Sequence, residues 1–236
     1  MELRAGTSGF SYDEWRGSFY PQDLPAGQML RYYADHLPAV EINNTFYRLP
    51  AEKMLRQWAE QVPSGFTFVL KASQRITHQK RLKDAGEPLS YLVTTSTVLG
   101  PSLGALLFQL PPNLKKDLPR LRDFLALLPA GLRAAFEFRH DSWFDDAVYT
   151  ELLARDAALC VADTLEGTTP FEPTARWGYL RLRREEYRDR DLADWVTRIR
   201  STDWSDAFAF FKHEDAGTGP RLATRFLSLF GGSAPG

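Results

Sequence analysis

The chain has 236 residues, of which 44% are hydrophobic and 25% charged, a balance typical of a globular protein. The formal net charge is -1, so no overall basic excess favours a nucleic-acid or acidic-membrane partner. The single cysteine, Cys160, excludes an intrachain disulfide, and we interpret it as a small core residue because its neighbours are apolar. The first residues lack the apolar core of a signal peptide, and no run approaches the roughly 18 apolar residues of a membrane span. We therefore expect a cytoplasmic protein with no membrane partner.

Short apolar runs alternate along the chain with segments of helical period. The predicted strands, in chain order, are residues 3–6, 39–43, 66–71, 105–110, 134–139, 159–163, 178–182 and 207–212. The predicted helices are residues 27–36, 51–61, 89–99, 118–128, 146–155, 192–199 and 222–230. Proline followed by a small residue and glycine, at 63–65 and 129–131, marks two joints where a helix ends and a strand begins.

Eight strands alternating with helices predict a TIM (β/α)8 barrel, formed by a single domain over residues 1–230 and followed by a disordered tail at 231–236. The alternative is an open, doubly wound sheet built from the same strand-helix units. The strand count favours the barrel. So does the lack of a Gly-x-Gly-x-x-Gly motif after any predicted strand.

Charges at alternate positions of buried strands locate a site. In residues 134–140, Glu137 and Arg139 share one side of a strand whose other side carries Phe136 and Phe138. Burying a charge costs several kcal/mol unless it is paired or functional. Applied to each strand end, alternation predicts that the mouth of the barrel holds Glu41, Asn43, Lys71, Gln109, Glu137, Arg139, Asp163 and Arg181.

Five motifs resemble, in order, those of the YecE-like family, a domain of unknown function numbered seventy-two in its series. They lie at residues 6–21, 41–48, 68–78, 107–112 and 136–144. The resemblance spans nearly the whole chain and implies a TIM-barrel fold, with no established activity. Two segments depart from the family pattern. Residues 181–184 read Arg-Leu-Arg-Arg where the family has Arg-x-His-Gly, and residues 211–215 read Phe-Lys-His-Glu-Asp where it has an acidic, Asn-rich turn. Both departures add basic residues.

The predicted mouth suits a small ligand that carries a phosphate or carboxylate. We predict Glu137, Glu41 and Lys71 as catalytic residues, because a carboxylate or an amine can transfer protons. Arginine offers a two-pronged donor to such an anion. The predicted substrate-binding residues are Asn43, Gln109, Arg139, His140, Asp163, Arg181, Tyr12 and Trp15. Hydrolysis, isomerisation and elimination would all fit these groups, and nothing in the sequence chooses among them.

Three other interpretations are weaker. The four histidines, His36, His78, His140 and His213, show no short ligand spacing, and nearby cations would repel a metal, so we predict no metal and no cofactor. A basic loop at 75–83 with aromatic residues near 15–20 could bind nucleic acid, but the near-zero net charge disfavours it. Finally, the charged cluster could be purely structural in a non-catalytic binding protein. The sequence predicts no oligomeric state.

Overall fold

A computed structural model describes residues 1–213 and 215–232. Its strands are β1 (Glu2–Ser8), β2 (Ala39–Ile42), β3 (Thr67–Lys71), β4 (Leu103–Gln109), β5 (Ala134–Glu137), β6 (Ala158–Thr164), β7 (Gly167–Thr168), β8 (Trp177–Leu182) and β9 (Asp206–Phe211). They pair in the order β5-β4-β3-β2-β1-β9-β8-β6, and a pairing of β5 with β6 closes the sheet. All pairings around this ring are parallel. The predicted TIM barrel is therefore confirmed, and the doubly wound alternative is wrong.

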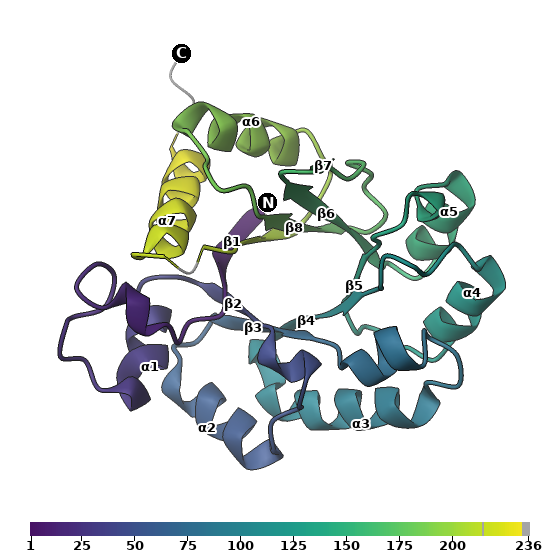
Figure 1. Ribbon diagram of the computed structural model, residues 1–236, viewed down its shortest axis with the longest axis horizontal. Helices are drawn as coiled ribbons and strands as arrows, with labels where there is room; N and C mark the ends of the chain where they lie inside the picture. Colours follow the sequence, from purple (N-terminus) through teal and green to yellow (C-terminus); the bar gives the residue numbers. More distant parts are fainter. Residues whose placement is uncertain (214, 233–236) are drawn as a thin grey trace.

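Helices surround the barrel (Figure 1). They are α1 (Met29–Ala34), α2 (Glu52–Gln61), α3 (Gly86–Ser96), α4 (Leu118–Ala126), α5 (Asp146–Leu153), α6 (Asp189–Arg200) and α7 (Thr218–Gly231). Aspartates begin two of them: Asp117 accepts a hydrogen bond from the Arg120 amide before α4, and Asp145 accepts one from the Ala147 amide before α5. At the two predicted joints, Gly65 and Gly131 adopt positive φ angles of 91° and 80°.

Each of the eight predicted strands is present, with ends shifted by one or two residues. We did not predict β7, a two-residue strand that pairs antiparallel with β6 and forms a hairpin at its end. At the C-terminus, α7 extends through Gly231, and residues 233–236 of the predicted tail lie outside the described residues. Within the described part, no helix is long and apolar enough to cross a membrane.

The barrel interior is filled unevenly. Large aromatic side chains from β8 and β9 meet small ones from β2, β4, β5 and β6. The aromatic members are Trp177, Tyr179, Phe208 and Phe210, and the small members include Ala39, Ala105, Ala135, Ala158 and Cys160. Since the aromatic rings fill the lower and middle barrel, the polar residues gather above them, at the C-terminal ends of the strands.

Candidate active site at the mouth of the barrel

A fully buried arginine joins two buried carboxylates at the top of the barrel. Arg181, near the end of β8, has no exposed surface. Its Nη1 donates to Glu137 Oε2 on β5 at 2.5 Å, and its Nη2 donates to Glu41 Oε1 on β2 at 2.6 Å. Nη2 also donates to Asn43 Oδ1 at 3.2 Å. Three strands that are distant in sequence are thus tied together by one guanidinium.

Two hydroxyl groups donate further hydrogen bonds to the Glu41 carboxylate. Tyr179 Oη donates to Glu41 Oε2 at 2.6 Å, and Ser8 Oγ donates to Oε1 at 2.7 Å. Burial alone raises the pKa of Glu41, but the charges of Arg181 and Arg183 and the hydrogen bonds from Arg181 and Tyr179 lower it to about 2. Both Glu41 oxygens are therefore occupied, and the carboxylate stays ionised at neutral pH.

Glu137 is held in the same way from the other side. Its Oε1 accepts hydrogen bonds from Gln109 Nε2 at 2.9 Å and from Arg139 Nε at 3.1 Å. Burial raises the pKa of Glu137, but the charges of Arg181, Arg183 and Arg139 hold it well below its ordinary value. A carboxyl group with so low a pKa is a poor proton donor and a weak base. The geometry therefore favours an electrostatic role over the general acid-base role predicted for Glu41 and Glu137.

Lys71 at the end of β3 extends this network. Its Nζ donates to Gln109 Oε1 at 2.8 Å and lies 4.2 Å from the centre of the Phe46 ring. Burial and the Arg181 charge lower the pKa of Lys71 to about 8. Gln109 thereby separates Lys71 from Glu137, with its amide donating to the carboxylate and its oxygen accepting from the amine.

Arg183 is a mouth residue that we did not predict. It follows Tyr179 and Arg181 at the same strand parity, and this spacing was the signal that could have identified it. Its Nε is buried without a hydrogen-bond partner, and in the described part of the chain no carboxylate pairs with its guanidinium. Burial and the charge of Arg181 lower the pKa of Arg183. Arg183 therefore contributes a positive charge that forms no salt bridge within residues 1–213 and 215–232.

A cavity of about 780 Å³, here called the mouth pocket, opens beside these residues. Glu137, Arg139 and Arg183 supply its charged base, and the hairpin at Thr164–Thr168 supplies one wall. The remaining walls are largely apolar, with Pro112, Phe138, Phe144, Leu165 and Pro170, while Asp141 and Glu166 are exposed at its rim. This volume is in the range of small-molecule sites.

The charges at the base of the mouth do not balance. Lys71, Arg139, Arg181 and Arg183 are cations, and Glu41 and Glu137 are the two buried carboxylates among them. Because Arg181 contacts both carboxylates, the positive excess falls on the other three cations. Arg139 is the most accessible, with 41% of its side chain exposed. The base of the mouth pocket can therefore attract an anion.

Seven predicted residues are brought together at the mouth: Glu41, Asn43, Lys71, Gln109, Glu137, Arg139 and Arg181. The inward direction predicted for Asp163 is wrong. The buried Asp163 carboxylate accepts hydrogen bonds from Tyr187 at 2.9 Å, Arg184 at 3.0 Å and Trp195 of α6 at 3.4 Å. On β6 it is Ala158 and Cys160 that face the barrel interior, so Asp163 points outward and anchors α6.

The three remaining predicted ligand residues have structural contacts. Trp15 is fully buried against Tyr12, with ring centres 4.7 Å apart, so its ring presents no exposed surface to a ligand in this structure. Tyr12 Oη donates to the Ser8 carbonyl at 2.6 Å, which fastens the loop after β1 to the barrel. His140 Nδ1 accepts from the Ser142 amide at 3.2 Å and caps a short 3₁₀ turn. Tyr12 and His140 are not among the residues that line the mouth pocket.

Two alternative interpretations can be compared with the structure. Among residues 1–213 and 215–232, no group of three or more His, Cys, Asp or Glu side chains could hold a metal ion. In the basic loop, Arg75 pairs with Glu87 at 3.2 Å, and residues 75–79 form a π-helical turn. His78 from this turn lies edge-on to Phe46, with ring centres 4.9 Å apart. The turn thereby brings an imidazole toward the mouth, which the sequence did not predict.

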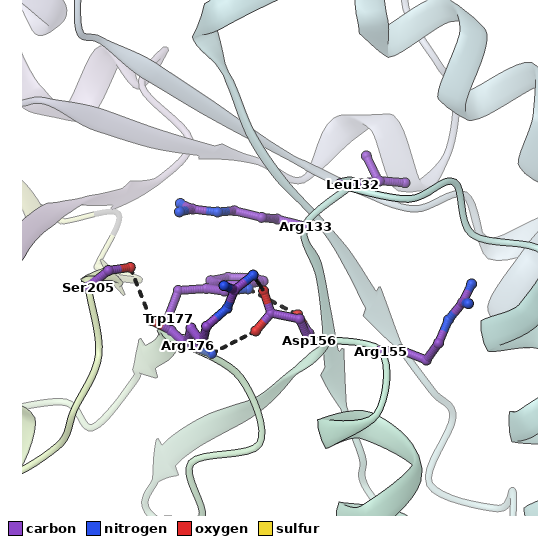
Figure 2. A pocket seen from close by; sticks show the side chains of 8 residues that line it. Leu132, Arg133, Arg155, Asp156, Arg176, Trp177 and Ser205 are labelled. Carbon is purple, nitrogen blue, oxygen red and sulfur yellow. Dashed lines mark hydrogen bonds and ion pairs between the residues drawn. The ribbon is translucent and has the colours of Figure 1, made fainter.

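A second pocket, of about 360 Å³, lies at the opposite end of the barrel (Figure 2). It also contains arginines, but each has an acceptor. Arg133 binds Asp206 through two hydrogen bonds of 2.6 and 2.9 Å. Arg176 pairs with Asp156 at 3.3 Å, and Arg155 donates to two backbone carbonyls of the α4 end. The arginines of this pocket thus have protein acceptors, two through aspartates and one through backbone carbonyls, which makes it a weaker candidate for an anion site.

Comparison with known proteins agrees with the fold and adds no activity. A family model described as "Protein of unknown function DUF72" matches residues 4–235. YecE of Escherichia coli K12 is 34% identical over 116 residues, covering 49% of this chain and 43% of YecE. YunF of Bacillus subtilis is 28% identical over 145 residues, covering 58% and 51%. The matched part thus spans about half the length of these curated relatives.

Solved structures show the same fold over the full chain. A DUF72 family protein of Thermotoga maritima superposes with a TM-score of 0.82 at 24% identity, covering 98% of this chain and all of that one. A DUF72 family protein of Enterococcus faecalis gives a TM-score of 0.81 at 19% identity, covering 99% and 97%. Both likenesses concern the fold.

Proposed function

Since the chain belongs to the DUF72 family, whose description assigns no reaction, we propose a function from its own site: the mouth pocket binds a small organic anion, on which the protein acts as an enzyme. The observation that carries this proposal is the pair Arg139 and Arg183. Both line a cavity of about 780 Å³, and neither is neutralised in full by the two buried carboxylates.

Arg181 has a different part in this proposal from the one predicted. Its two terminal nitrogens already donate to Glu41 and Glu137, so it has little capacity to bind a ligand directly. It fixes the two carboxylates instead, and Glu137 in turn orients Arg139 through the 3.1 Å hydrogen bond. We therefore assign the ligand-binding role that was predicted for Arg181 to Arg183.

In this proposal, a side chain near the bound anion can transfer a proton to or from it. Glu41 and Glu137 remain ionised, whereas Lys71 has a pKa of about 8 and exchanges its proton near neutral pH. Lys71 is thus the better proton-transfer group of the three predicted catalytic residues. The apolar walls, including Phe144 and Leu165, would limit water around the bound anion.

The test is thermal unfolding of the protein with increasing inorganic phosphate, and with a series of carboxylates and sugar phosphates. Ligand at 100 times its dissociation constant stabilises the folded state by about 2.7 kcal/mol. We expect this stabilisation in the wild type and its loss in the Arg139→Ala, Arg183→Ala double variant. The control is Arg176→Ala, which removes an exposed arginine at the opposite end of the barrel. Equal stabilisation of all three proteins would overturn the proposal.

A further inference from the structure

Lys71 differs from the other cations of the mouth because it is a primary amine that can lose its proton and become a nucleophile. Its side chain lies along the end of β3, and the residue retains 9% of its surface exposed. In the part of the chain that the structure describes, its Nζ contacts the Gln109 oxygen and the Phe46 ring, and no carboxylate pairs with it.

Burial shifts this amine toward its neutral form. A carboxylate contact would stabilise the ammonium ion, but Gln109 stands between Lys71 and Glu137. Burial is the largest influence on the Lys71 pKa, and the Arg181 charge lowers it further. Desolvation beside another cationic group is the known physical route to a reactive lysine.

His78 provides a partner for proton transfer in the same cluster. Its ring packs edge-on against Phe46, on which Lys71 Nζ also lies. Thr77 Oγ1 is 2.9 Å from His78 Nδ1 and helps to fix the ring. Burial, followed by the charges of Lys71 and Arg139, lowers the pKa of His78, so the imidazole is neutral at pH 7 and able to accept a proton.

From this geometry we propose that Lys71 forms an imine with a small anionic aldehyde or ketone whose acid group binds Arg139 and Arg183. This inference rests on the proposed anion site and names its substrate class, a carbonyl compound bearing a carboxylate or phosphate. Such compounds place an electrophilic carbon a few bonds from the acid group. Lys71 and Arg139 lie on the same hydrogen-bond network, through Gln109 and Glu137.

The step balances without any further reactant. The neutral amine lone pair of Lys71 attacks the carbonyl carbon, a C–N bond forms, and the carbonyl π electrons move to oxygen. His78 accepts one proton from the positively charged nitrogen and delivers it to this oxygen, which gives a neutral carbinolamine. His78 then accepts the second proton from the nitrogen and delivers it to the departing hydroxyl group. The C–O bond then breaks, water leaves, and a C=N bond joins the substrate to Lys71.

The experiment traps this imine by reduction. Wild-type protein is incubated with pyruvate and sodium borohydride, digested and mapped by mass spectrometry. The same is done with acetone, which has the carbonyl group but no charge. The exposed Lys115 is the internal reference for unselective labelling. We expect pyruvate to label Lys71 at least about tenfold more than Lys115, because a desolvated amine is more often neutral.

Two variants separate the parts of the proposal. Lys71→Arg keeps a cation at the position but removes the primary amine, and should lose the adduct while retaining stabilisation by phosphate. In the Arg139→Ala, Arg183→Ala variant, pyruvate should label Lys71 no more than acetone does. Labelling of Lys71 at the level of Lys115 in the folded wild type would overturn the imine proposal. Equal labelling of Lys71 by pyruvate and acetone in the wild type would instead overturn the anion site.

Discussion

The two ends of the barrel both carry arginines, but they use them differently. At the N-terminal end, Arg133 pairs with Asp206, and Arg176 pairs with Asp156, the second contact being visible in Figure 2. At the C-terminal end, Arg181 pairs with both buried carboxylates through its terminal nitrogens, Arg139 shares Glu137 with it, and Arg183 has no salt bridge among the described residues. Protein groups satisfy the arginines of the pocket at the N-terminal end. At the mouth, an excess of cations over carboxylates costs stability and is the basis of the proposed anion site.

The largest expected effect follows from removing the buried arginine of the mouth. Arg181→Met leaves Glu41 buried without a counter-ion and Glu137 with only the partly exposed Arg139, and should lower the free energy of unfolding by about 3–5 kcal/mol. The matched change at the other end is Arg133→Met. Asp206 then keeps its hydrogen bond from Arg4, so we expect a loss of about 1–2 kcal/mol. Urea unfolding of both variants measures the difference, and equal losses would contradict it.

The next effect concerns pH and Lys71. The folded-state pKa of Lys71, about 8, lies below its ordinary value of 10.5, so between these values the unfolded chain binds more protons. Stability contributed by this group therefore rises as the pH increases from about 8. The Lys71→Met variant lacks this rise. The free energy of unfolding of Lys71→Met minus that of the wild type should therefore fall by about 1–2 kcal/mol between pH 7.5 and 9.5.

Unfolding of the wild type and Lys71→Met at each pH checks this prediction. Cys160 and Tyr179 also affect the pH dependence of stability, because burial raises their pKa in the folded protein above the ordinary values that apply in the unfolded chain. These groups are present in both proteins, so their influence cancels in the difference. A difference that stays constant with pH would mean that the Lys71 amine is not perturbed in the folded protein.

A smaller effect, of opposite sign to the first, should come from Arg183. Its charge is partly buried and unpaired among the described residues, so Arg183→Met should raise the free energy of unfolding by about 1 kcal/mol in buffer without multivalent anions. The gain should disappear when phosphate is added, because phosphate then stabilises the wild type. A loss of stability in both buffers would show that Arg183 is a structural residue.

The smallest effect is expected at the exposed arginine of the opposite end. The Arg176 side chain is 88% exposed and pairs with Asp156 across 3.3 Å. Replacing it with alanine should change the free energy of unfolding by less than about 0.5 kcal/mol. Stabilisation by phosphate should be the same as in the wild type. A marked reduction of phosphate binding would place an anion site at this end and remove the contrast between the two pockets.

The fold was predictable because each strand is a short apolar run in the sequence. The alternation of side chains along the strands then predicted five residues at the mouth: Glu41, Lys71, Gln109, Glu137 and Arg181. Alternation failed on β6, whose Ala-Leu-Cys-Val-Ala run is apolar on both faces and gives no clue to which face looks inward. Asp163 was therefore assigned to the wrong side. It could be buried facing outward because Tyr187, Arg184 and Trp195 satisfy it.

Loop residues were harder to predict, since their positions depend on tertiary packing. Trp15 looked like a ligand-stacking residue, but it forms a small aromatic core with Phe19 and Tyr20. The approach of His78 to Phe46 depends on a π-helical turn with no clear sequence signature. The pairing of Arg181 with two carboxylates, which leaves Arg183 as the unpaired arginine, likewise became visible in three dimensions.

A crystal structure of the protein grown or soaked in sulfate tests the central claim most directly. Sulfate has the charge and size of the predicted anionic group and would meet both arginine-rich pockets at the same concentration. The account predicts sulfate between Arg139 and Arg183 at the base of the mouth pocket, with no sulfate beside Arg133 and Arg176. Sulfate in the pocket of the opposite end, with the mouth pocket empty, would contradict it.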